Sequence, residues 1–201
     1  MHETLPNICA IVLAAGQGVR MGGPKAMLAW GAQSLASAHA EAALDVGIGR
    51  VVVVVREGWT EALGTLPRGA DWCISREDES LGPAGSLRAA RRALAREGAV
   101  YEWLAIGPVD VSPEAWAVVP ELVHRVGTHD AAKPRYDARN GHPVLVRASA
   151  LAIEDTRPLR TQLSALGERV ITVRVGERAV LCDMDNPAQV REVLAAKSQR
   201  T

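Results

Sequence analysis

The sequence predicts an α/β domain in which a mostly parallel, mixed sheet carries helices on both faces. Short apolar runs alternate along the chain with segments of helical periodicity, and this alternation is typical of α/β domains. The run at 51–55 consists of five successive valines, as expected of a strand that is buried on both faces. No repeat, linker or low-complexity block interrupts the pattern. We therefore expect one domain over residues 1–201, with a polar tail over 197–201.

The predicted strands are short apolar or β-branched runs bounded by turn residues. They span residues 8–13, 51–55, 71–75, 103–106, 131–133, 144–146 and 170–175. A polar stretch, 135–141, joins the fifth and sixth of these strands.

Four helices are predicted from apolar spacing and from signals at their ends. One runs from Leu35 to Val46 and a second covers 85–97. The third begins at Ser112, a capping hydroxyl that is followed by a proline and a glutamate in the first turn. We expect Pro120 to shorten or kink this helix. A last helix is expected over 186–194.

Composition bounds the class of protein. Apolar residues make up 48% and charged residues 23%, as in ordinary soluble domains. The formal net charge is zero, so no nucleic-acid partner is expected. No apolar run approaches the length of a membrane span, and the N-terminus lacks the apolar segment of a signal peptide. The expected location is the cytoplasm.

The most informative stretch is 11–25, IVLAAGQGVRMGGPK, where a strand runs directly into a glycine-rich turn. Glycines let backbone N–H groups approach an anion closely, and Arg20 and Lys25 supply positive charge. The stretch therefore predicts a triphosphate site. A Walker loop does not fit, because Lys25 is followed by Ala26 instead of Ser or Thr. The dinucleotide fingerprint fits poorly, because Met21 stands where its third glycine belongs.

Residues 13–25 resemble the nucleotidylyltransferase signature Leu-Ala-Ala-Gly-x-Gly-x-Arg-Met-Gly-x-Pro-Lys, as found in the MobA-like NTP transferase family. The likeness is closest to the molybdenum cofactor cytidylyltransferases. It implies a Rossmann-like, nucleotide-diphospho-sugar transferase fold and Mg²⁺-dependent transfer of a nucleoside monophosphate from an NTP to a phosphorylated acceptor, with release of pyrophosphate. It also implies that Arg20 and Lys25 are catalytic. The implied nucleotide-binding residues of the loop are Leu13, Ala14, Ala15, Gly16, Gln17 and Gly18.

Candidate metal carboxylates stand at two places. Asp110 follows the fourth predicted strand, and ligands in open α/β sheets lie beyond the carboxyl ends of the strands. Mg²⁺ prefers one or two carboxylates together with substrate oxygens, so we expect Asp110 to hold the metal and to act in catalysis. The segment 181–187 resembles the family's Asp-Ile-Asp-Thr-Pro-Glu-Asp, which implies a second metal ligand at Asp183 or Asp185. Spacing leaves both open, and proximity to a helix start favours Asp185.

Residues 140–146, Asn-Gly-His-Pro-Val-Leu-Val, resemble a Gly-His-Pro-Val-Leu-Phe segment of the cytidylyl branch. With Lys133 and Arg135 close by in sequence, they predict a site for the acceptor phosphate, to which His142 donates a hydrogen bond. We do not expect His142 to act as a general base, because a phosphate nucleophile is already ionised near neutral pH.

Residues 81–88 loosely resemble the family's Gly-Met-x-x-Ser-Leu-Arg loop. This likeness implies contacts of Gly85 and Ser86 with the nucleobase and ribose. The helix that follows carries arginines at 88, 91, 92 and 96, which we expect to form a solvated face.

Several alternatives stay open. Details of the loop favour CTP over GTP, but a guanylyltransferase is a rival within the same family. The implied acceptor is molybdopterin, whereas related enzymes use sugar, alditol or lactate-derived phosphates. A non-catalytic, nucleotide- or cofactor-binding chaperone that accompanies a molybdoenzyme is a further alternative, although Arg20, Lys25 and Asp110 argue against it.

Overall fold

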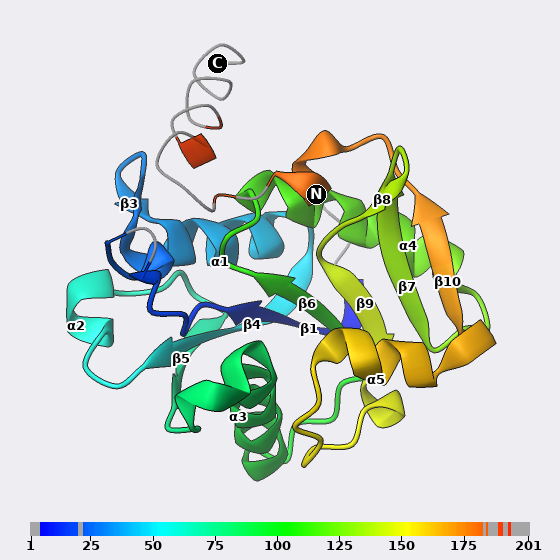
Figure 1. The fold of residues 1–201 in the computed structure, drawn as a ribbon, viewed down its shortest axis with the longest axis horizontal. Helices are drawn as coiled ribbons and strands as arrows, with labels where there is room; N and C mark the ends of the chain where they lie inside the picture. Colours follow the sequence, from blue (N-terminus) through cyan, green and yellow to red (C-terminus); the bar gives the residue numbers. More distant parts are fainter. Residues whose placement is uncertain (1–4, 20–21, 183, 185–188, 191–192, 194–201) are drawn as a thin grey trace.

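Strands that are distant in the sequence lie side by side in an eight-stranded sheet, in the order β10-β7-β9-β6-β1-β4-β5, with β8 paired to β7 (Figure 1). The computed structural model describes residues 5–19, 22–182, 184, 189–190 and 193. The strands are β1 (Leu5–Leu13), β4 (Ile48–Arg56), β5 (Ala70–Ser75), β6 (Trp103–Pro108), β7 (Ala131–Tyr136), β8 (Arg139–Asn140), β9 (Val144–Arg147) and β10 (Val170–Arg174). A separate antiparallel pair is formed by β2 (Ala29–Trp30) and β3 (Gln33–Ser34).

Most strand pairs of the sheet are parallel. β1 pairs in parallel with β4 and β6, β4 with β5, and β7 with β10. β9 is antiparallel to both β6 and β7, so those two strands run in the same direction. Leu13, the last residue of β1, is paired with Val54 and Pro108. The loops that follow β1, β4 and β6 therefore open at one edge of the sheet.

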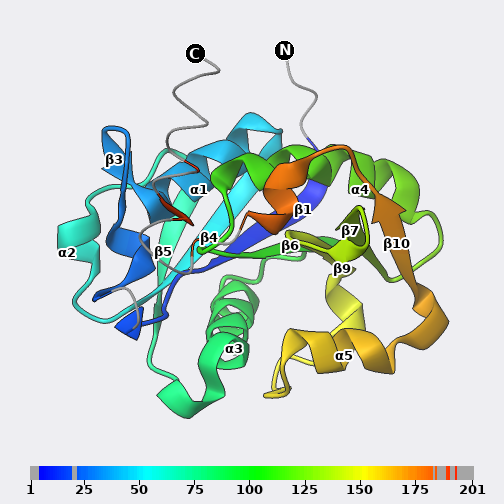
Figure 2. The same ribbon diagram turned by 45° about the horizontal axis from the view of Figure 1, so that its top comes forward.

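Helices cover both faces of the sheet (Figure 2). Apolar residues of α1 (Leu35–Asp45) and α4 (Val119–Val126) pack on one face, and those of α3 (Gly82–Arg96) and α5 (Leu159–Ala165) pack on the other. Alternate residues of the central strands enter opposite cores: Val51 and Val53 join the first, and Val52 and Val54 join the second. This double burial explains the uninterrupted valine run.

The remaining elements are short. They are α2 (Thr60–Leu63) and the 3-10 helices η2 (Lys25–Met27), η3 (Glu79–Leu81), η4 (Pro113–Val118), η5 (Ala148–Ala150), η6 (Gly167–Arg169) and η7 (Arg178–Leu181). Within the described ranges, no helix combines the length and apolarity that a membrane crossing requires.

The predicted fold class is confirmed, and each predicted strand is present, with every end at most three residues from its predicted position. The helix expected from Ser112 differs. Ser112 does cap a helix, with its hydroxyl accepting from Glu114 N at 3.4 Å, but that helix is the 3-10 helix η4. An α-helix, α4, begins only at Val119, and Pro120 lies in its first turn, where its missing N–H costs no hydrogen bond.

Two further differences concern helices near the C-terminal end. Helix α5 has no counterpart among the predictions, because its apolar face is narrow and its seven residues give little periodicity. Most of the helix expected over 186–194 lies outside the described residues.

Candidate active site

The glycine-rich loop after β1 is shaped by backbone contacts. Ala14 N donates to Val54 O at 2.9 Å, which continues the pairing with β4 beyond the end of the strand. Gly23 N donates to Gly18 O at 3.3 Å and closes the loop. Gly18 has φ +61°, and a Cβ there would lie only 1.9 Å from the Gly23 oxygen, so this turn requires glycine. Arg20, the predicted catalytic cation of the loop, lies outside the described residues.

Lys25 and Asp110 meet at the edge of the sheet where β1 and β6 end. Lys25 begins η2, just after the glycine-rich loop, and Asp110 stands two residues beyond β6. Lys25 Nζ lies 3.2 Å from Asp110 Oδ2, although the residues are 85 positions apart. The Lys25 side chain is 14% exposed and that of Asp110 35%. The pair is therefore half-buried and open to a ligand from one side.

A cavity of about 470 Å³ adjoins this ion pair. Of the predicted site residues, those that line it are Leu13, Ala15, Gly16, Gln17, Gly18, Lys25, Ser86 and Asp110. Ala14 is fully buried beneath the loop. Gly85 is buried as well: a Cβ there would lie 3.1 Å from the Glu77 Cβ, so this glycine permits close packing of α3 against the preceding loop. Ser86, one residue further on, is the one of the two that lines the cavity.

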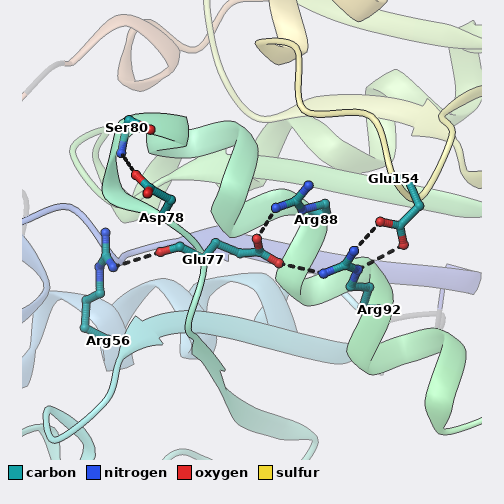
Figure 3. Close-up of polar contacts among 7 residues, drawn as sticks. All are labelled: Arg56, Glu77, Asp78, Ser80, Arg88, Arg92 and Glu154. Carbon is teal, nitrogen blue, oxygen red and sulfur yellow. Dashed lines mark hydrogen bonds and ion pairs between the residues drawn. The ribbon is translucent and has the colours of Figure 1, made fainter.

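Arg56 is a site residue that the sequence reasoning missed. It ends β4 and lines the cavity. Its Nη1 donates to Glu77 O at 3.1 Å (Figure 3). Its Nε donates to Ala15 O at 3.3 Å, so Arg56 joins the glycine-rich loop to the loop before α3. A signal was available: the position directly after the valine run is the carboxyl end of a parallel strand, where ligands are expected.

Glu77 is the centre of an ion-pair network behind this wall (Figure 3). Its carboxylate, whose side chain is 14% exposed, pairs with Arg88 and, at 3.0 Å, with Arg92. Arg92 also donates to Glu154 through Nε at 2.9 Å. The expectation of a solvated arginine face is wrong for Arg88, which is 17% exposed and pairs with Glu77, and for Arg91, which is partly buried and donates to Ala148 O at 3.0 Å. Arg92 is 37% exposed and keeps contact with solvent while it pairs with Glu77.

The loop between Glu77 and α3 contains the short helix η3, whose N-terminus is capped by Asp78. The carboxylate of Asp78 accepts from Ser80 N at 2.8 Å at the start of η3, and hydrogen bonds from Ser80 lower the pKa of Asp78 (Figure 3). Glu79, which follows, lines the cavity and accepts a hydrogen bond from the Gln17 amide. The side chains of the two loops thus meet across one wall of the cavity.

The Asp110 turn is bonded to its neighbours through backbone groups. Val109 N donates to Leu13 O at 3.1 Å, and Met184 N donates to Asp110 O at 2.6 Å. Ser112 N donates to Cys182 O at 3.1 Å, so the backbone at positions 182 and 184 runs beside this turn. Asp183 and Asp185 themselves lie outside the described residues, and the choice between them as metal ligand stays a prediction.

The predicted acceptor residues lie in the other half of the sheet. His142 precedes β9, whose pairing of Val144 with Ile106 of β6 directs His142 toward the end of β6. His142 N donates to Val180 O at 3.1 Å. A Cβ at Gly141 would lie 2.3 Å from that same oxygen, so glycine is required there.

The two basic residues of the predicted acceptor site are on β7. Lys133 is partly buried, whereas the exposed Arg135 donates to the carbonyls of Asp137 and Ala138 at 3.3 and 3.4 Å. Neither these residues nor His142 line the cavity beside Lys25. The structure therefore brings the predicted nucleotide-loop residues together at one cavity, whereas the predicted acceptor residues lie outside its lining.

The donor set suits a hard divalent cation that arrives with phosphate. Asp110 offers carboxylate oxygens at the cavity wall, which matches a Mg²⁺ site completed by substrate oxygens and water. Among the described residues, no group of three or more His, Cys, Asp or Glu side chains could enclose a metal. A cation here therefore needs its ligand, or carboxylates beyond the described residues, to complete its coordination.

The MobA-like NTP transferase domain matches residues 10–193. The chain belongs to this family. It is a nucleotidyltransferase; enzymes of this family use an NTP and a phosphorylated acceptor, typically with a divalent metal, and transfer the nucleoside monophosphate with release of pyrophosphate. No curated protein matches the sequence.

Solved structures share the fold. One is the Mycobacterium sp. strain JC1 homologue of Mycobacterium tuberculosis Rv0371c, at 22% identity and a TM-score of 0.76, covering 97% of this chain and 98% of that one. A second is Rv0371c of M. tuberculosis H37Rv in complex with manganese, at 19% identity and a TM-score of 0.65; the match covers 94% of this chain and 99% of that one. A third is 2-C-methyl-D-erythritol 4-phosphate cytidylyltransferase from Thermus thermophilus, at 20% identity and a TM-score of 0.60; the match covers 93% of this chain and 97% of that one.

Proposed function

We propose that this protein transfers a cytidylyl group from CTP to the phosphate of molybdopterin and releases pyrophosphate. The observation that carries the proposal is the contact between Lys25 Nζ and Asp110 Oδ2 at 3.2 Å, on the wall of a cavity lined by the glycine-rich loop. A cation, a carboxylate and a run of backbone amides at one cavity are the groups that a metal-bound triphosphate requires.

In the proposed reaction, an oxygen of the acceptor phosphate bonds to the α-phosphorus of the NTP. The bond from that phosphorus to the oxygen that bridges the α- and β-phosphates breaks, and its electron pair leaves with pyrophosphate. Lys25 and Arg20 stabilise the negative charge that grows on the leaving group, and the backbone amides of residues 15–19 bind the phosphates. Fixed charges that act in this way supply most of the catalysis in such transfers.

Asp110, together with Asp185 or Asp183, would hold Mg²⁺. The ion, when bound, neutralises the triphosphate so that a second phosphate can approach it. The structural neighbour with manganese supports a divalent ion in this fold. Lys25 balances the Asp110 charge in the absence of ligand.

The choice of CTP and of molybdopterin is supported by the sequence of the two loops. The Ala-Ala-Gly start of the glycine-rich loop and the segment Gly141-His142-Pro143 resemble the cytidylyl branch of the molybdenum cofactor enzymes. Lys133, Arg135 and His142 are proposed to hold the acceptor phosphate. The strand directions support this, because β7 runs in the same direction as β6 and His142 precedes β9 at the edge of the sheet where β6 ends. A structural neighbour that is itself a cytidylyltransferase supports the same base.

The experiment is a pyrophosphate-release assay with CTP, GTP, ATP and UTP, Mg²⁺, and molybdopterin or an alditol phosphate as acceptor. We expect release with CTP and molybdopterin only, and no metal-dependent release by Asp110→Asn. Preference for GTP, or for the alditol phosphate, would replace the proposed substrates. A protein that binds nucleotides by thermal shift but releases no pyrophosphate with any pair would instead be a binding chaperone.

A further inference from the structure

His39 is a buried ionisable residue of α1 that the proposed reaction does not use. It is 2% exposed and lies in the core between α1 and η4. Burial lowers its pKa to about 4, so the ring is neutral at working pH. A neutral imidazole carries one proton, on either Nδ1 or Nε2, and its partners determine which.

The partners of His39 fix the position of that proton. Trp116 Nε1 lies 2.9 Å from His39 Nδ1, and the two rings meet edge to face at 84°. An indole N–H can only donate, so His39 Nδ1 must accept and the proton must be on Nε2. Nε2 lies 3.2 Å from Val109 O and therefore donates to it.

Val109 is the residue directly before Asp110. Its carbonyl and the Asp110 N–H belong to one planar peptide group, so the hydrogen bond from His39 fixes the plane from which the Asp110 side chain departs. Trp116 also packs directly against the strand that leads into this turn. A Cβ at Gly107 would lie 3.2 Å from the Trp116 ring, so indole and strand β6 are in close contact.

We propose that His39 is a positioning residue for the transfer reaction. Through its Nε2–H it holds the Val109 carbonyl, and thereby aims the Asp110 carboxylate into the cavity beside Lys25. Trp116 takes part as well: its N–H donates to His39 Nδ1, and this favours the tautomer whose proton is on Nε2 and can be donated to Val109 O. The role rests on the proposed function, in which Asp110 serves the reaction.

Two substitutions separate the hydrogen bond from simple packing. In His39→Gln the side-chain amide nitrogen reaches the place of Nε2 and can still donate to Val109 O. In His39→Asn the shorter amide reaches only the place of Nδ1, so it can still accept from Trp116 but cannot reach Val109. Gln162→Met is the matched control, since Gln162 is also a buried polar residue but donates to Arg157 O at 2.7 Å on the opposite face of the sheet.

We expect kcat per folded molecule to fall about ten- to a hundredfold in His39→Asn, with KM for CTP unchanged, because a displaced catalytic group costs turnover. His39→Gln keeps kcat within about threefold of the wild type. Gln162→Met changes the melting temperature and leaves kcat unaltered. A His39→Asn enzyme with wild-type kcat, or a His39→Gln enzyme as impaired as His39→Asn, would overturn the proposal.

Crystal structures of both His39 variants give a readout that does not depend on the substrates. The 3.2 Å contact of Lys25 Nζ with Asp110 Oδ2 should persist in His39→Gln and be lost in His39→Asn. Persistence in both variants would sink the positioning role even if the enzyme is active. Failure of the wild type in every pyrophosphate assay would instead sink the proposed function. If His39→Asn does not fold, His39→Met provides the same test, because its side chain cannot donate to Val109 O.

Discussion

The two halves of the sheet deliver their polar residues to the same edge in different ways. In the half formed by β1, β4, β5 and β6, all strands are parallel, and the polar residues that reach the cavity lie at or after the carboxyl ends of their strands, as Lys25, Arg56 and Asp110 illustrate. In the half formed by β7, β9 and β10, β9 runs against its neighbours, and the residue at that edge, His142, precedes its strand. The rule that ligands lie beyond the carboxyl ends of strands therefore locates the cavity residues of the first half. It does not locate His142, the proposed acceptor residue of the second half, because this residue precedes its strand.

The two halves also differ in the hydrogen-bond and ion-pair partners of their polar side chains. In the parallel half, the Lys25 and Asp110 side chains face each other at a cavity. In the mixed half, Arg135 donates to carbonyls of its own hairpin and lies outside the lining of that cavity. The cavity proposed to bind the nucleotide is thus formed in the parallel half, and the proposed acceptor residues lie outside its lining. The predictions that follow probe this difference.

Removal of the cation in the parallel half should have the largest effect. Lys25→Met should lower kcat for pyrophosphate release roughly a hundred- to a thousandfold, since one preorganised donor to the leaving group is lost. Arg125→Met is the control: Arg125 is exposed on α4 and pairs with Glu121 at 3.2 Å, far from the loop in sequence and on a helix that contributes nothing to the cavity lining. Near-normal turnover of Lys25→Met would remove Lys25 from the mechanism.

The shape of the glycine-rich loop is tested by two alanines that differ in the space around them. Gly18→Ala places a Cβ 1.9 Å from the Gly23 oxygen, so the loop must deform, and we expect kcat/KM for the NTP to fall about thirty- to a hundredfold. Gly22 also has a positive φ, +76°, but a Cβ there meets nothing within 4 Å. Gly22→Ala should therefore cost far less. Equal losses in the two variants would show that backbone strain, and not the close approach, limits the loop.

In the mixed half, Gly141→Ala should act on the acceptor alone. Its Cβ would lie 2.3 Å from Val180 O, which displaces His142 from its hydrogen bond with that oxygen. Steady-state kinetics should give a KM for the acceptor raised about tenfold, with KM for the NTP unchanged. Gly127→Ala, with a positive φ and open space at the end of α4, is the control for loss of a glycine. A change in the NTP KM alone would contradict the assignment of this segment to the acceptor.

The remaining prediction concerns stability and not turnover. The pKa of His39 is lowered from 6.5 to about 4, mainly by burial. Between these pH values the unfolded chain binds a proton at His39 that the folded protein excludes. The free energy of unfolding should therefore be full above pH 6.5 and should fall as the pH drops toward 4, by about 3 kcal/mol from this group. Urea unfolding of the wild type and of His39→Gln over this range measures it. Parallel pH curves for the two proteins would exclude His39 as the cause.

The sequence was most informative where local chemistry decides the outcome. The valine run, the apolar face of α3 and the capping Ser112 all have effects that reach only a few residues, and the corresponding elements are present. The glycine at position 18 is required by a turn formed within six residues. Helix α5 and the 3-10 form of η4 escaped prediction, because weak periodicity and a nearby proline leave the local preference undecided.

The sequence by itself determined the alternation of strands and helices, the glycine-rich cradle and the residue types of a triphosphate site, since these depend on spacing along the chain. Only the tertiary structure decided that Arg56 joins two loops, that Arg88 and Arg92 pair with Glu77, and that His39 supports the turn before Asp110. These contacts join residues from separate elements. Their distances are set by how helices pack on the sheet, and no pattern within one element records that packing.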